Sequence, residues 1–292
     1  MNTTLLHVRD LVPDFLACLD DRGGLPVERW RTGYLDRHPD VRAAVDRDGA
    51  WSDTGDLAGL LDRVAASRAE LAARSGAVRA LLPAAVSAVA AALDWAGEGG
   101  PVQCVVLVGL DRANGWAGTL VDRYALFLAV EQLGDHDDLL VRHEAAHVVH
   151  DRLAGIRDWP EHAVAGTLLA EGLATQVSAE TLPGLPDETY LWFGRPGYGP
   201  WLADCRRAWP LILDRVAADL AAVDLDRHAP YFLMRDSPAG AGLPKRCGYL
   251  VGLAVVRTLR GRYPLREIAS WDLDRATAEI RAVLPTLRPT GG

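Results

Sequence analysis

Lysine and paired cysteines are the scarcest features of this sequence. Lys245 is the single lysine, the other 30 of the 31 basic residues are arginines, and these are dispersed along the chain. The formal net charge at pH 7 is −8. A nucleic-acid-binding protein needs a concentrated basic surface, so this composition argues against a nucleic-acid partner.

The cysteines are few and show no paired spacing. The chain has 4 of them in 292 residues, at Cys18, Cys104, Cys205 and Cys247. Neither a disulfide framework nor a thiolate metal site fits such scattered positions. We therefore expect four buried free thiols.

Signals for a membrane or for export are also missing. We find no apolar run close to the roughly 18 residues of a membrane span, and the N-terminal segment MNTTLLHVRDLVPDF has no basic start followed by a long apolar stretch. With 49% apolar residues, the composition is that of an ordinary globular chain. The sequence predicts a cytoplasmic protein without a membrane partner.

What the sequence does contain is a His-Glu-x-x-His pattern, in the stretch LLVRHEAAHVVHDRL. It places His143, Glu144 and His147 in order, and a chain of this composition matches the pattern about 0.008 times by chance. Acidic residues precede the stretch, Gly155 follows it, and neither Pro nor Gly interrupts it, so the sequence predicts a helix over 137–154. On a helix the two histidines lie on one face, close enough to hold one metal ion.

An isolated histidine is most often an ordinary core or surface residue. This helix, however, is apolar at nearly every other position. Burying two imidazoles and a carboxylate without partners would cost several kcal/mol, and a bound metal removes that cost. A catalytic zinc normally takes three protein ligands, so the two histidines require a third.

A downstream glutamate is the best third ligand. A histidine six positions after His147 is excluded, because that residue is Leu153. The following segment instead predicts a second helix over 160–181, with Glu171 on a small, apolar face. An antiparallel return of this helix points Glu171 at the two histidines, and Gly172 lets the helices approach closely. The alternative is that Glu171 is the buried partner of an arginine.

The pattern HEAAH followed by AEGLA resembles the gluzincin group of zinc metallopeptidases. Within that group it is similar to predicted Zn-dependent proteases in which an EGLA segment follows the HExxH helix. The resemblance covers about residues 102–182 and is loose beyond them. It implies three zinc ligands, a general base and an oxyanion donor, which are in turn His143, His147 and Glu171, then Glu144, then Tyr249 in CGYLVG. A tyrosine that is merely packed in a helix is the alternative for the last of these.

The chain departs from the gluzincin pattern at one position. The best-known gluzincins have an acidic residue one turn after the ligand glutamate, where it supports a ligand histidine, and this chain has Thr175 there. His150 and Asp151 are partial substitutes, or else solvent-exposed polar residues at the end of the first helix.

The fold class predicted for the chain is α+β and predominantly helical, with a zincin-like core and a small mixed sheet. We expect three parts: a helical N-terminal region over 1–100, a metal-binding core over 101–182, and a mainly helical C-terminal region over 183–292 that completes the cleft. The GEGGP segment marks the first boundary.

The expected elements outside the metal-binding helices are these: helices at 5–19, 26–35 and 56–95, the last broken at Gly76 and Pro83; a buried strand at 101–110; one or two strands within 119–130, next to the loop DRANGWAGT; and a further helix within 246–264.

Two features bear on the substrate. In gluzincin-like folds an edge strand of the sheet pairs with an extended peptide. Gly115, Trp116 and Gly118 would then line the cleft, with a plain tight turn as the alternative. The aromatic segment at 190–202 either walls a substrate pocket or serves ordinary packing.

These observations predict a single-zinc hydrolase that acts on a peptide or protein substrate. Zn²⁺ would polarise the water and the scissile carbonyl, while Glu144 takes the water proton and delivers it to the leaving amine. Two histidines and one carboxylate also suit Fe²⁺, so an Fe(II)/2-oxoglutarate-dependent hydroxylase is an alternative. A catalytically silent interaction module is a third reading, and the intact Glu144 counts against it.

Overall fold

The computed structural model describes residues 5–19, 26–47, 56–110, 113–195, 198–234 and 242–288. The chain forms two compact units. The first comprises residues 1–87 and 99–148, and the second comprises 88–98 and 149–292. Two helices, α5 (Arg68–Ala92) and α6 (Asp137–Ala154), each begin in the first unit and end in the second.

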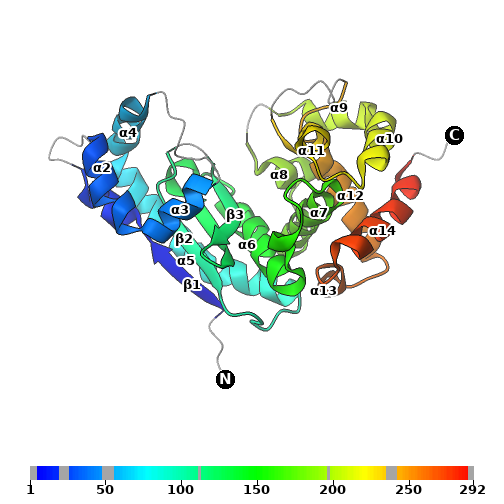
Figure 1. Ribbon diagram of the computed structural model, residues 1–292, viewed down its shortest axis with the longest axis horizontal. Helices are drawn as coiled ribbons and strands as arrows, with labels where there is room; N and C mark the ends of the chain where they lie inside the picture. The colour runs from blue at the N-terminus through cyan, green and yellow to red at the C-terminus, as the bar shows by residue number, and fades with distance from the viewer. Residues whose placement is uncertain are drawn as a thin grey trace. The chain divides into compact units, whose positions relative to one another are not determined.

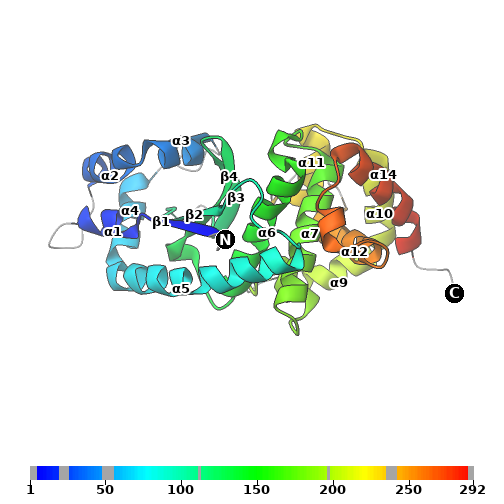
Figure 2. The ribbon, with the colours of Figure 1, turned by 90° about the horizontal axis from the view of Figure 1, so that it is seen from below.

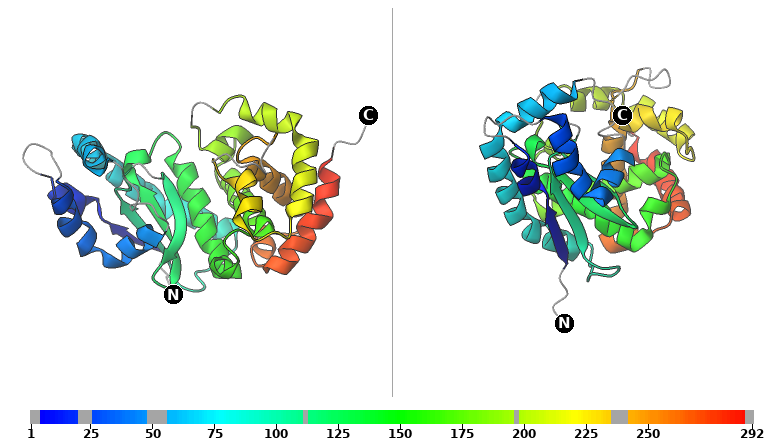
Figure 3. Two further views of the ribbon diagram at one scale, coloured as in Figure 1. Left: turned by 45° about the horizontal axis from the view of Figure 1, so that its top comes forward. Right: turned by 60° about the vertical axis from the view of Figure 1, so that its left-hand side comes forward.

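The first unit contains a mixed sheet of four strands in the order β1-β2-β4-β3. Figure 3 shows the strands as arrows from two further directions. Strands β1 (Leu6–Asp10), β2 (Val102–Leu107) and β4 (Arg123–Ala129) are parallel, and β3 (Gly115–Leu120) pairs antiparallel with β4. The expected buried strand at 101–110 is confirmed, and so is a mainly helical α+β fold with a small mixed sheet.

The expectation of a helix over 5–19 is wrong in its first half. Leu6–Asp10 is strand β1, paired in register with β2. The helix α1 starts only at Val12, whose N–H donates to Asp10 Oδ1 at 3.0 Å. Local sequence alone leaves this segment ambiguous, and pairing with a distant strand decides it.

Most of the expected loop DRANGWAGT is also strand. Gly115–Leu120 forms β3, and the tight turn lies at Val121 and Asp122, between the paired residues Leu120 and Arg123. Trp116 stacks on its cross-strand partner Phe127, with ring centroids 5.0 Å apart. The tight-turn alternative for Gly115, Trp116 and Gly118 is therefore wrong.

Helices of the first unit surround this sheet. They are α1 (Val12–Ala17), α2 (Val27–Gly33), η1 (Leu35–Arg37), α3 (Pro39–Arg47), α4 (Leu57–Ala66), η2 (Val130–Gln132) and the first parts of α5 and α6. Helix α5 runs along one side of the strands in Figure 2.

The expected breaks at Gly76 and Pro83 are wrong, because α5 passes through both residues and the chain breaks instead at Ser67. One face of α5 is buried at helical spacing, at Val78, Leu82, Val86 and Val89. Burial of an apolar stripe outweighs the local cost of one glycine and one proline.

By length and composition, α5 is apolar enough to cross a membrane, contrary to our expectation that no run approaches that length. Core helices of soluble proteins meet the same criterion, so the finding carries no assignment. The buried stripe shows that α5 uses one face for packing within the protein.

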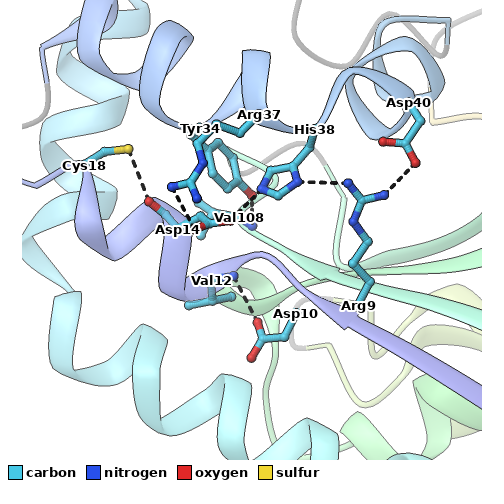
Figure 4. Close-up of polar contacts among 10 residues, drawn as sticks. All are labelled: Arg9, Asp10, Val12, Asp14, Cys18, Tyr34, Arg37, His38, Asp40 and Val108. Atoms are coloured by element: carbon cyan, nitrogen blue, oxygen red, sulfur yellow. Dashed lines mark hydrogen bonds and ion pairs between the residues drawn. The ribbon is translucent and has the colours of Figure 1, made fainter.

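A polar network ties α1, η1 and α3 to β1 (Figure 4). His38 Nε2 lies 2.8 Å from Asp14 Oδ2, and His38 Nδ1 lies 2.9 Å from Arg9 Nη2. Because a guanidinium only donates, His38 Nδ1 accepts and its Nε2–H donates to Asp14. Arg9 also donates to Asp40 at 2.6 Å. Burial alone would raise the pKa of Asp40, but the hydrogen bond and charge of Arg9 outweigh burial and lower it.

The second unit is helical (Figure 1). After η3 (Ile156–Asp158) its helices are α7 (Val164–Thr181), α8 (Asp187–Trp192), α9 (Trp201–Arg207), α10 (Trp209–Asp219), α11 (Leu225–Phe232), α12 (Cys247–Arg260), α13 (Leu265–Ile268), α14 (Leu273–Val283) and η5 (Leu284–Leu287). The expected helix within 246–264 is confirmed as α12. All four cysteines are buried free thiols, as expected.

Helices α7 and α12 pack backbone against backbone. A Cβ atom at Gly172 would lie 2.2 Å from Gly252 O, and one at Gly252 would lie 2.5 Å from Leu168 O. Gly172 therefore does permit a close helix approach, but the sequence-based choice of partner was wrong, since the helix it meets is α12 and not α6.

Side-chain contacts fix the direction of this helix pair. Arg257 donates to Gln176 at 3.3 Å, and Arg260 donates to Glu180 at 3.1 Å. Residues later in α12 thus meet residues later in α7, so the two helices run parallel.

We predict that Gly172→Ala lowers the free energy of unfolding by about 2 kcal/mol or more, because the new methyl group collides with backbone atoms that cannot rotate away. Gly76→Ala is the matched control. Its Cβ would meet nothing within 4 Å in the interior of α5, so it should raise stability by about 0.5–1 kcal/mol. Urea unfolding of the three proteins measures both effects. A Gly172→Ala protein as stable as the wild type would contradict the close approach.

Candidate metal centre

The helix that carries the His-Glu-x-x-His pattern has the predicted bounds. α6 spans Asp137–Ala154, with Asp137 and Asp138 in its first turn and Gly155 directly after it at φ 65°. Acidic residues at the start stabilise the positive end of the helix dipole. The left-handed conformation after the last turn suits glycine.

The second helix begins later than predicted. α7 starts at Val164, and Pro160 lies in the turn before it, where its carbonyl accepts from the N–H of Ala163 at 2.9 Å. The N–H of Val164 donates to Ala222 O at 3.0 Å, outside the helix. A tertiary hydrogen bond therefore sets this start, and the predicted end at 181 is confirmed.

The centre of α6 is buried on every side although it carries polar groups. His143 is 3% exposed, and Glu144 and His147 are each 8% exposed. Buried polar groups need partners inside the protein. At the start of the helix, for example, Arg142 donates to Asp138 at 2.9 Å.

The two histidines are close enough to share one ion. His143 Nε2 and His147 Nε2 lie 3.2 Å apart, and the rings meet edge to face at 80°. Two nitrogens bound to one tetrahedral zinc at 2.0–2.1 Å are about 3.3 Å apart. The observed separation therefore matches that of a shared metal.

Glu171 completes the group. One ligand atom each from His143, His147 and Glu171 all lie within 4.8 Å of one another. Ligand atoms on one tetrahedral zinc ion are about 3.3 Å apart, so these three side chains could hold a metal ion if they moved closer together on binding it.

The neighbours of this group differ from what the sequence suggested. Thr175 is fully buried, and its hydroxyl donates to the carbonyl of Glu171 at 2.8 Å within α7. The expectation that His150 and Asp151 are solvent-exposed is wrong, because they are 0% and 3% exposed. Asp151 accepts from Arg157 Nη1 at 2.8 Å, so it stabilises the turn after α6 through an ion pair.

Tyr249 lies on α12, one turn before Gly252, the residue that meets α7. Its ring is half-buried and is covered by the guanidinium of Arg246, whose Cζ is 4.0 Å from the ring centroid. Phe232 packs at its edge, 6.1 Å away.

The sequence analysis missed Arg246. The only local signal was a basic residue at the first position of the predicted helical stretch 246–264, at the end where cations are disfavoured, three residues before Tyr249. The expected aromatic segment at 190–202 supplies Trp192, which also contacts Arg246, with Cζ 4.5 Å from its ring centroid.

Comparison of the chain with family models, with curated proteins and with solved structures found no match.

We predict that the protein binds about one zinc ion per chain, and that changing any one of His143, His147 or Glu171 to Ala weakens binding by at least about 100-fold, since losing a ligand costs more than losing its supporting hydrogen bond. His7→Ala and Glu161→Ala, on exposed side chains, are the matched controls. Elemental analysis after dialysis against a weak chelator measures the metal. Ligand variants that keep as much zinc as the controls would show that the ligand set is wrong.

Proposed function

We propose that this protein is a zinc-dependent hydrolase that cleaves peptide bonds, built on a zincin-like core. The observation that carries the proposal is the group of His143, His147 and Glu171 within 4.8 Å, with Glu144 between the two histidines in sequence. This arrangement supports the resemblance to gluzincin metallopeptidases that the sequence suggested.

Glu144 is the proposed general base. When bound, the zinc ion would act as a Lewis acid on a carbonyl and on water. Glu144, on α6 and 8% exposed, accepts the proton of the attacking water and passes it to the leaving amine. Its low exposure keeps bulk water from competing for that proton.

The edge of the sheet supports a peptide as the substrate. β3 is the last strand of the sheet and is antiparallel to its neighbour. A Cβ at Gly115 would lie 3.3 Å from Leu140 Cδ2, one turn before His143 on α6. A peptide that adds to this edge would receive main-chain hydrogen bonds beside the helix that carries two of the ligands.

The main alternative is an Fe(II)/2-oxoglutarate-dependent hydroxylase, because two histidines and one carboxylate are also the ligands of that class. Such an enzyme takes its oxidant from O₂ and needs no base to activate water. Glu144 therefore separates the two functions.

We predict that Glu144→Gln keeps its metal and loses peptide hydrolysis, because the amide preserves the size of the side chain but cannot accept the proton. The loss should be about 10²- to 10⁴-fold in kcat, the usual contribution of a general base. Bound metal and turnover of a peptide mixture are measured together for the variant and the wild type.

Glu161→Gln is the control, since Glu161 is exposed and lies outside the ligand group. Undiminished hydrolysis by metal-loaded Glu144→Gln would rule out this mechanism. Iron in place of zinc, with oxygen uptake that depends on 2-oxoglutarate, would favour the hydroxylase.

Tyr249 is the proposed donor to the oxyanion. We predict that Tyr249→Phe retains fold and metal while kcat falls about 10²- to 10³-fold and KM changes little, because one such donor acts mainly in the transition state. Tyr263→Phe also removes one hydroxyl, which donates to Glu279 at 3.1 Å, and it should leave kcat unchanged. An unchanged kcat in Tyr249→Phe would assign Tyr249 to packing.

A further inference from the structure

Arg246 is held in place by two aromatic rings. Its Cζ lies 4.0 Å from the ring centroid of Tyr249 and 4.5 Å from that of Trp192. Trp192 is 3% exposed and stacks on Tyr198 at 3.6 Å, so it is a rigid support. Aromatic faces attract the guanidinium through cation–π contact and leave the N–H groups at its edge available to an acceptor.

The same unit contains a second arginine in this setting. Arg275 lies over Tyr263 and Trp271, with Cζ 5.7 and 4.8 Å from the ring centroids. Its guanidinium edge is taken by Glu267, at 2.6 Å. Arg246 forms no ion pair with any carboxylate among the described residues, which are 5–19, 26–47, 56–110, 113–195, 198–234 and 242–288.

The backbone around Arg246 adds to the positive potential. Arg246 is the residue before the first turn of α12, a 14-residue helix with no acidic residue in that turn and no side-chain cap. A cation at this end of a helix is unfavourable and an anion is favourable. Arg246 also has φ 61°, a conformation that costs a non-glycine residue free energy and that occurs often at ligand-binding positions.

The position of Arg246 connects it with the proposed function. Its guanidinium Cζ lies 4.0 Å from the ring centroid of Tyr249, so the two side chains are in contact. Tyr249 lies one turn of α12 before Gly252, which contacts α7 at Gly172, the residue after Glu171. A ligand group bound by Arg246 would therefore lie next to the proposed oxyanion donor.

We propose that Arg246 binds a carboxylate of the substrate, either the C-terminal carboxylate of a peptide or an acidic side chain near the scissile bond. The planar fork of a guanidinium matches a carboxylate with two parallel N–H···O bonds. The inference rests on the proposed peptidase function for the identity of the ligand. If Arg246 binds a carboxylate, the protein selects peptides whose carboxylate reaches Arg246. The chain's net charge of −8 would otherwise disfavour such ligands.

The experiment measures binding apart from turnover. Zinc-loaded Glu144→Gln protein is titrated calorimetrically with three N-acetylated alanine peptides of one length: the free acid, its C-terminal amide, and the amide with one internal glutamate. We expect one of the two carboxylate peptides to bind about 10- to 100-fold tighter than the uncharged amide, the range for a charge-assisted bond. Which of the two is preferred identifies the source of the carboxylate.

Variants in the same background test the role of Arg246. Arg246→Met should bring the three affinities within about twofold of one another, while Arg275→Met, its matched control, should keep the preference. Arg246→Lys retains the charge but not the fork, and it should keep only part of the preference. It also provides the test if Arg246→Met fails to fold. Equal binding of all three peptides by the parent protein, or a preference that survives Arg246→Met, overturns the proposal.

Failure of this proposal is distinguishable from failure of the proposed function. Hydrolysis of peptides by the wild type without any carboxylate preference removes the role of Arg246 alone. A carboxylate preference that depends on Arg246, in a protein that hydrolyses no peptide, removes the peptidase function alone.

Discussion

The backbone contact between Gly172 and Gly252 is the constraint on which the second unit depends. With no side chain at either position, α7 and α12 approach until a carbonyl of one helix would touch a Cβ of the other. Two parallel helices this close have one possible register, so the position of every residue on α12 is set relative to α7. Glu171 follows from that register on one helix, and Tyr249 and Arg246 follow from it on the other. Glycine packing between the two helices thus sets the positions of Tyr249 and Arg246 relative to Glu171.

The main constraint on the first unit is the burial of a helix, α6, that carries polar side chains. α6 carries histidines and carboxylates through a segment with no more than 8% exposure at His143, Glu144 and His147. Such a helix is stable only when its polar groups meet one another or a ligand. The Nε2 atoms of His143 and His147 lie 3.2 Å apart, so each imidazole has a polar neighbour. A shared cation would stabilise the pair further, because two coordinate bonds would replace the contact between two similar rings. On the proposed function, metal binding would be coupled to folding of this region.

Boundaries that depend on residues close together in sequence were predicted correctly, and boundaries that depend on distant residues were not. The bounds of α6 were predictable because its start and stop depend on Asp137, Asp138 and Gly155, all local. β1 was missed because only its partner strand, about a hundred residues away, makes the segment extended. The start of α7 was misplaced because the carbonyl of Ala222 receives the N–H of Val164.

The residues of the candidate site also divide into those set by local sequence and those set by distant contacts. The pairing of His143 with His147 is a local property of one helix, and the sequence was sufficient for it. The glycine partner on α12 and the contact of Arg246 with Trp192 involve residues far apart in sequence, and no local pattern specifies these pairings. His150 and Asp151 were expected to be exposed because they stand near a helix end, yet Arg157 in the turn that follows pairs with Asp151, and the Trp159 ring lies against His150.

Thr175 stands where the best-known gluzincins have an acidic residue, and its hydrogen bond shows what it does instead. The Thr175 hydroxyl returns to the carbonyl of Glu171 at 2.8 Å, so it supports the helix that carries the ligand and offers no carboxylate to an imidazole. A carboxylate at that position would both orient a ligand histidine and raise its basicity. Burial can replace the first effect, because close packing around side chains at 3% and 8% exposure holds their rotamers. Packing therefore orients the candidate ligand histidines, and Thr175 supports the helix that carries Glu171.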